Sequence, residues 1–166
     1  MSTKDLKNEK AWNKLKDLAE DIDFAMMETN LGGRPSHIIP MSTKKVDDEG
    51  NVWFLSAADS DHNQFINKDN AIQLIYSKPG EMEYMVIYGK AFIYTDKKII
   101  KEFYSKTDDS WFNGIDDPNV SAIKIIPEEG YYWDTKNGKL TTMLKIGIGA
   151  ITGKQKDVGV KGELHI

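Results

Sequence analysis

The sequence predicts a mainly β protein, built as an antiparallel β-barrel with peripheral helices. Short apolar segments recur along the chain, separated by turn signals of the hairpin type at residues 47–51, 78–80 and 137–138. Helical patterns are short and lie at the start of the chain or between the predicted strands. No regular alternation of strand and helix is present, which argues against a parallel α/β sheet.

The composition fits one domain spanning residues 1–166. The formal net charge is -4, and acidic and basic residues are interleaved, so we expect no nucleic-acid partner. The absence of cysteine excludes a disulfide framework and thiolate chemistry, and fits a cytoplasmic protein. We expect no signal peptide and no membrane span, because the chain is charged from Lys4 onward and no apolar run approaches ~20 residues. The three histidines lie far apart, so no metal site is predicted.

The first predicted element is an amphipathic helix over residues 4–21. Apolar residues at helical spacing alternate with Lys and Asp, and Trp12 extends the same stripe. We expect this helix to pack on a sheet; the alternative is a helix that binds a partner protein. The stripe consists of Ala11, Leu15, Leu18 and Ile22.

Two strands should follow the helix, at residues 23–29 and 34–43, joined by a turn at residues 30–33. Pro40 falls inside the second strand. Because proline cannot donate to a β ladder, Pro40 marks an edge strand, a bulge or an interruption for a ligand, with the edge strand as the default.

The next strand begins at Val52, and a helix should follow it. Ser60 is a suitable N-cap for a short helix that continues to Lys68. A strand that leads into a helix N-terminus gathers unpaired backbone N–H groups, which suit a phosphate, and His62 could add a donor. The alternative is an ordinary strand-to-helix corner.

The remaining segments continue the pattern of strands and short helices. Strands are predicted at residues 71–77 and 83–94, and Gly89 inside the second indicates a bulge or a bend. Thr95 and Asp96 should cap a helix that runs to about residue 105. The last predicted elements are an irregular loop at 108–119, strands at 120–126 (closed by Pro127) and 131–134, a turn at Asn137 and Gly138, and a segment at 140–151 in which Gly147 and Gly149 weaken the helical pattern.

Several short motifs occur in a specific order. Each is weak alone, but the ordered set is specific, and the sequence resembles the general stress protein 26 branch of the pyridoxamine 5'-phosphate oxidase-like, FMN-binding split-barrel family. The matching residues are Pro40-Met41, Val46 to Gly50, Trp53 to Ser56, Asp59-Ser60, Tyr88 to Ala91, Trp111-Phe112 with Gly114 and Asp117-Pro118, Tyr132 to Asp134, and Thr152 to Lys154.

This resemblance implies a six-stranded antiparallel split β-barrel that forms a homodimer, with FMN bound in each of two clefts between the subunits. Ser60 and His62 would take the phosphate, and Trp111 or Trp133 would lie near the cleft; the alternative for both tryptophans is core packing. The other residues implied at the flavin are Ile39, Pro40, Met41, Phe54, Leu55 and Ser56.

Two positions depart from the family pattern. The family often has Arg where this chain has Ile39, and Lys where it has His62. The FMN phosphate carries roughly two negative charges, and charge-assisted hydrogen bonds are the strong ones. We therefore expect weaker phosphate binding, unless Arg34, His37 or Lys44 compensates.

Three functions stay open at this point. The protein could be a flavin-dependent oxidoreductase of unknown substrate, a binding or storage dimer for a flavin or another planar ligand such as haem, or a structural dimer that has lost its ligand. No catalytic acid–base pair is predicted. Hydrolysis is not indicated, because the chain has no cysteine and no Gly-x-Ser-x-Gly elbow.

Overall fold

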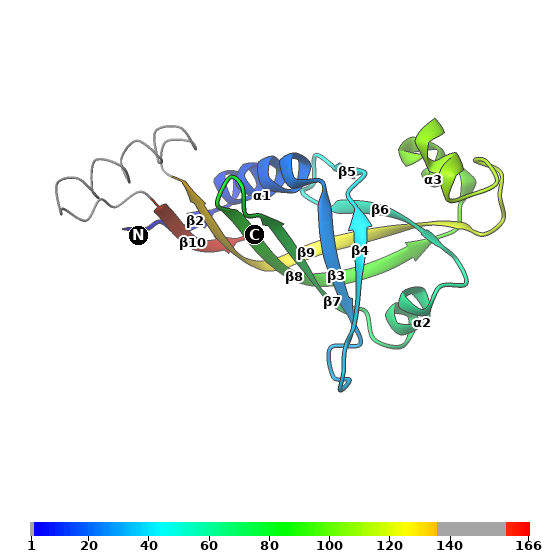
Figure 1. The fold of residues 1–166 in the computed structure, drawn as a ribbon, viewed down its shortest axis with the longest axis horizontal. Helices are drawn as coiled ribbons and strands as arrows, with labels where there is room; N and C mark the ends of the chain where they lie inside the picture. Colours follow the sequence, from blue (N-terminus) through cyan, green and yellow to red (C-terminus); the bar gives the residue numbers. More distant parts are fainter. Residues whose placement is uncertain (1, 136–158) are drawn as a thin grey trace.

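The computed structural model describes residues 2–135 and 159–166. Ten strands of these residues form one sheet in the order β1-β10-β9-β8-β7-β3-β4, with β2 paired to β10 and the β5–β6 hairpin paired to β9 (Figure 1). The strands are β1 (Ser2–Thr3), β2 (Leu6–Lys7), β3 (Phe24–Thr29), β4 (His37–Ser42), β5 (Lys45–Val46), β6 (Val52–Ala57), β7 (Ala71–Lys78), β8 (Glu83–Tyr94), β9 (Val120–Thr135) and β10 (Gly159–His165). The helices are α1 (Glu9–Ile22), α2 (Asp61–Lys68), α3 (Lys97–Phe103) and the 3-10 helix η1 (Lys106–Ser110).

The predicted mainly β, largely antiparallel architecture is confirmed, but the sheet is not closed. Among the described strands, β4 pairs only with β3, and β5 pairs only with β6. The sheet also has ten strands in the described residues rather than the six that the resemblance implies. Three of the strands that the sequence did not predict, β1, β2 and β5, are two residues long, too short for an alternating pattern.

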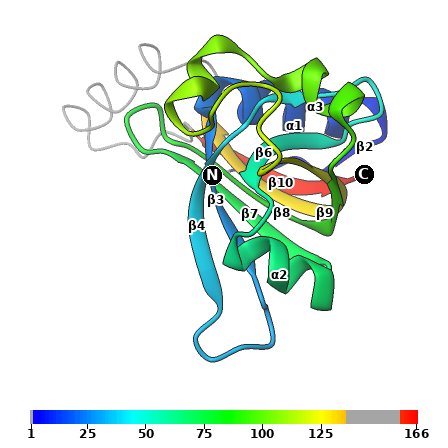
Figure 2. The same cartoon turned by 90° about the vertical axis from the view of Figure 1, so that its right-hand side faces the viewer.

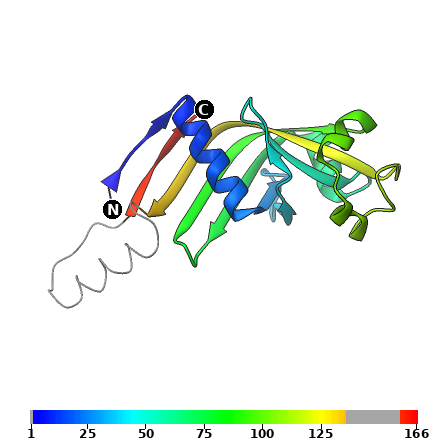
Figure 3. The same cartoon turned by 90° about the horizontal axis from the view of Figure 1, so that it is seen from above.

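Helix α1 packs on one face of the sheet through Leu15, Leu18 and two alanines, as predicted (Figure 3). The helix begins at Glu9 rather than at residue 4, because Leu6 and Lys7 pair with β10 instead. Trp12 is 39% exposed and does not belong to the buried stripe. It lies against the turn at Gly50.

Strand β9 is continuous for 16 residues where the sequence predicted two strands separated by Pro127. Its register against β8 shifts between Tyr88, which faces Glu129, and Gly89, which faces Pro127. The shift leaves one extra residue on β9, so Gly89 and Pro127 together form the bulge that Gly89 indicated. A bulge allows the ladder to pass a residue that has no N–H, and the strand continues.

The face of the sheet opposite α1 exposes large apolar side chains. Residues on this face alternate with buried ones along each strand, and the register places Met26 of β3 beside Pro40 of β4 and Ile75 of β7. We call this surface the open sheet face. Its exposed large apolar residues are Phe24, Met26, Ile38, Tyr84, Tyr88 and Tyr131.

The other predicted elements lie close to their expected positions. Ser60 caps α2 by accepting a hydrogen bond from the backbone N–H of Asn63, and Asp96 caps α3 through the N–H of Lys98. The β3–β4 hairpin extends beyond the sheet next to α2 (Figure 2). The predicted turn at Asn137 and Gly138, the segment 140–151 and the motif at 152–154 lie outside the described residues.

Replacing Gly89 with alanine tests the bulge. A Cβ at this position would lie 2.3 Å from the carbonyl oxygen of Ile126, a backbone atom that cannot rotate away. Because overpacking of this kind typically costs about 1–3 kcal/mol, we expect Gly89→Ala to lower the free energy of unfolding in urea by that amount. Gly80→Ala is the control, since a Cβ there meets nothing within 4 Å. Equal midpoints for the two variants would contradict this account.

Candidate functional site

A cleft of about 510 Å³ lies where the sheet stays open, between β4 and β6. Its volume falls in the range of small-molecule sites, roughly 300–1,000 Å³. The β3–β4 hairpin forms one wall, β6 and the start of α2 form another, and the segment that begins in η1 closes the third side. The lining residues are Phe24, Ile39, Pro40, Met41, Ser42, Lys44, Leu55, Ser56, Ala57, His62, Thr107, Asp108, Trp111 and Phe112.

The position of Pro40 fits the open side of the sheet. Within the described residues β4 has a strand neighbour on one side only, where Pro40 faces Met26. A proline is tolerated on such an edge, because its missing N–H breaks no ladder. The edge-strand prediction for Pro40 is therefore confirmed, and this edge forms a wall of the cleft.

A buried polar network lies behind the cleft wall. The hydroxyl of Ser56 is within hydrogen-bond distance of His62 Nε2 at 2.5 Å and of the Asn63 side-chain oxygen at 3.2 Å. His62 Nε2 also lies 3.1 Å from the hydroxyl of Ser60. Asn63 in turn donates to Ser121, whose hydroxyl donates to the backbone oxygen of Ser56. The network fixes the imidazole against β6 and the first turn of α2.

His62 is uncharged at neutral pH. Burial, together with the neighbouring His37, lowers the pKa of His62 from 6.5 to about 4, against the opposing effect of Asp61. The two imidazole rings are stacked, with centroids 6.3 Å apart, and Phe65 lies 5.3 Å from His37. His37 Nε2 is buried and has no hydrogen-bond partner among the described residues. This corner therefore offers the hydroxyl of Ser56 and the neutral imidazole of His62 to a ligand.

An ion pair joins the two sides of the cleft. Lys44 donates two hydrogen bonds to the carboxylate of Asp108, at 2.9 and 2.8 Å. Asp108 also accepts from the backbone N–H and the hydroxyl of Ser105, which shapes η1. Burial acts to raise the pKa of Asp108, but the hydrogen bonds from Lys44 and Ser105 outweigh it and hold the pKa below its ordinary value. The pair thereby fixes the segment that carries Trp111, which is 84% exposed at the cleft rim.

The structure brings most of the predicted site residues together in this cleft. Phe54, Ser60 and Trp133 do not line it. Phe54 is fully buried in the main core, and Ser60 caps α2 behind His62. Trp133 lies on the half of β9 that pairs with β10, stacked on Tyr131. The predicted residues that line the cleft are Ile39, Pro40, Met41, Leu55, Ser56, His62 and Trp111.

The lining residues that sequence reasoning missed are Phe24, Ser42, Ala57, Thr107, Asp108 and Phe112. The sequence did contain a signal for Asp108 and Phe112, because both fall in the irregular loop predicted at residues 108–119. Of the cations that could replace the family's Arg and Lys, Lys44 lines the cleft but is bound to Asp108, and Arg34 is not among the lining residues.

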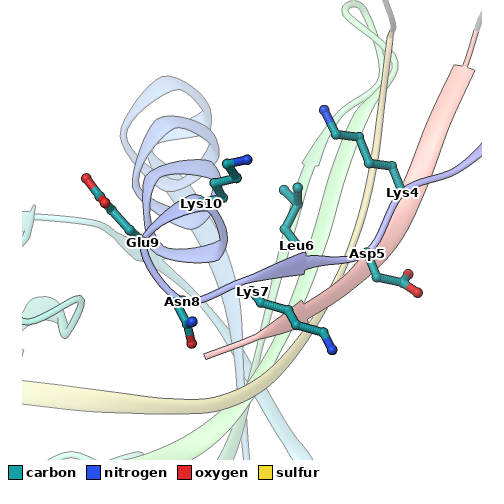
Figure 4. A pocket seen from close by; sticks show the side chains of 7 residues that line it. All are labelled: Lys4, Asp5, Leu6, Lys7, Asn8, Glu9 and Lys10. Carbon is teal, nitrogen blue, oxygen red and sulfur yellow. The ribbon is translucent and has the colours of Figure 1, made fainter.

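Other hollows among the described residues are more open to solvent than this cleft. One, of about 480 Å³, is formed by the continuous segment 4–10. Figure 4 shows that its charged side chains point in different directions and do not converge on a common point. A binding site needs convergent polar groups around an apolar surface, and the cleft between β4 and β6 combines the two.

The described helices include none that is long and apolar enough to cross a membrane.

An open, largely antiparallel sheet with a cleft at its unpaired edges defines a split-barrel type of protein. The chain belongs to the family described as pyridoxamine 5'-phosphate oxidase like, which matches residues 10–157. The resemblance predicted from the sequence, to the general stress protein 26 branch, is confirmed. No curated protein sequence matches the chain.

Solved structures show the same fold. A protein from Jannaschia sp. CCS1 assigned as a general stress protein 26 superposes with a TM-score of 0.72 at 27% identity, over 93% of this chain and 95% of its own. A protein from Clostridium acetobutylicum, related to general stress protein 26 of B. subtilis, gives 0.66 at 21% identity, over 80% and 94% of the two chains. The general stress FMN/FAD binding protein from Xanthomonas citri gives 0.63 at 19% identity, over 75% and 87%.

The free energy of unfolding, measured as a function of pH, tests the environment of His62. Between pH 6.5 and about 4 the unfolded chain binds a proton that the folded protein excludes, so the free energy of unfolding should fall as the pH falls. Above this window both states are neutral, and the contribution is constant. We expect His62→Gln to flatten the fall between pH 7 and 5 in urea denaturation. His165→Gln is the control, because it removes an imidazole from an exposed position on β10, away from His62. A slope that is the same in all three proteins would show that His62 is not held neutral.

Proposed function

We propose that the protein binds FMN in the cleft between β4 and β6 and acts as a flavin-dependent oxidoreductase, in the form of a cytoplasmic homodimer. The observation that carries the proposal is the cleft itself, which combines an apolar lining, a strand edge without a neighbour and a hydroxyl–imidazole corner in a chain of this family. The substrate and the electron donor are left open.

The lining residues fit a flavin. Ile39 and Met41 offer apolar contact on one wall and Leu55 on the other, which suits the faces of a planar ring. The outer edge of β4 carries backbone groups without a strand partner, which can bind the polar edge of such a ring. Bound FMN would supply the redox chemistry, and the protein would supply binding, orientation and the exclusion of water.

The choice of FMN over FAD rests on the lack of a dinucleotide-binding loop in the sequence and on a related protein. FMN has one terminal phosphate and needs no dinucleotide-binding loop, and the Gly147-Ile148-Gly149 stretch lacks the third glycine of such a loop. The Xanthomonas citri structure with this fold is an FMN/FAD binding protein. Ser56 and His62 are the residues we propose beside the phosphate-bearing ribityl chain of the ligand, with Ser60 holding His62 from behind.

We propose the homodimer because the open sheet face exposes large apolar side chains. Exposed apolar patches of this kind mark interaction surfaces in soluble proteins. Phe24 belongs both to this face and to the cleft, and it is 59% exposed. A second copy packed on the open sheet face would therefore also cover the cleft, as expected for a site between two subunits.

A non-catalytic flavin-binding or storage dimer is the second candidate. The cleft residues favour it in one respect, because Lys44 and Asp108 neutralise each other and His62 is held by two serines, so the described lining offers no uncommitted acid–base pair. Bleaching of the bound flavin by NADH or NADPH, followed by reoxidation in air, would distinguish an oxidoreductase from a storage protein. A flavin that no nicotinamide donor reduces would favour storage.

The absorbance spectrum of the purified protein tests flavin binding directly. We expect a flavin spectrum, or quenching of flavin fluorescence when FMN is titrated into colourless protein. Trp111→Ala should weaken binding by about 2- to 10-fold, since an aromatic contact at the rim is typically worth about 0.5–1.5 kcal/mol. The control is Trp12→Ala, because Trp12 is exposed on α1 and does not line the cleft. Failure to bind either FMN or riboflavin would refute the proposal.

Light scattering at micromolar concentration tests the homodimer. Met26 lies in the middle of the open sheet face and is 41% exposed, so Met26→Glu should leave the folded subunit intact and convert a dimer into a monomer. Trp12→Glu likewise places a carboxylate at a similarly exposed apolar position, but on α1, where we expect no effect on assembly. A monomeric wild-type protein would contradict the proposed dimer.

A further inference from the structure

We propose that the cleft recognises the isoalloxazine ring and ribityl chain of a flavin and is indifferent to the terminal phosphate, so that riboflavin binds about as tightly as FMN. This inference rests on the proposed flavin-binding function and specifies which part of the ligand the protein recognises.

The first argument is the charge balance of the cleft. Its ionisable lining residues, among those described, are Lys44, Asp108 and His62. Lys44 is the one fixed cation of this set, and its ammonium group lies 2.8 Å from the nearer carboxylate oxygen of Asp108. The two side chains are only 16% and 12% exposed, so salt screens the attraction between them only weakly. Its net charge is zero.

The second argument is the state of the hydroxyl–imidazole corner. His62 Nε2 is held by the hydroxyls of Ser56 and Ser60, and burial beside the stacked ring of His37 makes a positive charge on His62 unfavourable. Asp61, in the first turn of α2, adds a negative charge beside this corner and opposes an anion. The corner can donate neutral hydrogen bonds, which suit ribityl hydroxyls as well as a phosphate.

The consequence follows from the cost of moving a dianion out of water. A phosphate gains strong binding where a fixed cation forms charge-assisted hydrogen bonds to it, and without one its desolvation is not offset. The phosphate of FMN should therefore stay directed toward solvent. The ring and the ribityl chain are common to FMN and riboflavin, and the apolar lining contacts both ligands in the same way.

The test is the ratio of two dissociation constants, for riboflavin and for FMN, measured by quenching of flavin fluorescence at pH 7.5. For the wild-type protein we expect a ratio within about threefold of one, which is less than 1 kcal/mol of discrimination. Asp108→Asn keeps an acceptor for Ser105 but releases Lys44. It should tighten FMN binding by about tenfold or more, as a charge-assisted bond to phosphate would, and leave riboflavin binding nearly unchanged.

Lys44→Met makes the opposite change. It leaves Asp108 without its cation, so FMN should bind more weakly than riboflavin, and the double variant Lys44→Met with Asp108→Asn should return the ratio to about one. The two single variants are expected to change the ratio of dissociation constants in opposite directions. The test therefore still decides if one of them fails to fold. Glu163→Gln is the matched control, since it removes the same unit of negative charge on β10, which does not line the cleft.

The outcomes separate this inference from the proposed function. A wild-type ratio that favours FMN by about tenfold or more, insensitive to the Lys44 and Asp108 variants, would overturn the inference while leaving flavin binding in place. Absence of binding by both flavins would overturn both. Ratios that move in opposite directions in the two single variants would establish that the ion pair with Asp108 keeps the ammonium group of Lys44 from binding the phosphate.

Discussion

The backbone ladder of β9 is the interaction on which the rest of the structure depends. Over its 16 residues this strand pairs with β8 along nearly its whole length, and on its other side with β10 in one half and β6 in the other. Both hydrophobic clusters include residues of β9, such as Ile123 in the main core and Val120 beneath α3. The bulge at Gly89 and Pro127 keeps the ladder continuous, and the position of β6 on β9 in turn sets the wall that faces β4 across the cleft.

The elements with a strong local pattern were predictable from the sequence. The helix stripe of Leu15 and Leu18, the alternation in β7 and the capping residue Ser60 each reflect interactions within a few residues of chain. The continuity of β9 was not predictable, because Pro127 ends a strand unless a partner such as Gly89 forms a bulge opposite it. The pairing of residues 2–7 with β10 was missed for a similar reason, since their strand partners lie more than 150 residues away along the chain.

For the candidate site, motif order identified most of the cleft residues, but it could not identify their partners. Phe54 belongs to a motif at the cleft and yet faces the core, since the direction of a side chain depends on how its strand packs. The ion pair between Lys44 and Asp108 spans 64 residues of sequence, and either residue alone resembles a surface charge. Sequence alone therefore leaves open whether Lys44 replaces the cations that the family often has, whereas the folded chain pairs this lysine with Asp108 and holds His62 uncharged.

The pairing of the first residues with the last strand has a consequence for the order of folding. Leu6 lies beside Leu164, and the backbone N–H of Lys4 donates to the oxygen of Lys161, so these contacts close a loop of nearly the whole chain. Closing so long a loop costs somewhat more entropy than closing the short loops between β7, β8 and β9, and strands of two residues offset little of that cost. The pairing of β1 and β2 with β10 should therefore form after the β7–β8–β9 core and open before it. The amide hydrogens of this pairing should exchange with solvent without global unfolding.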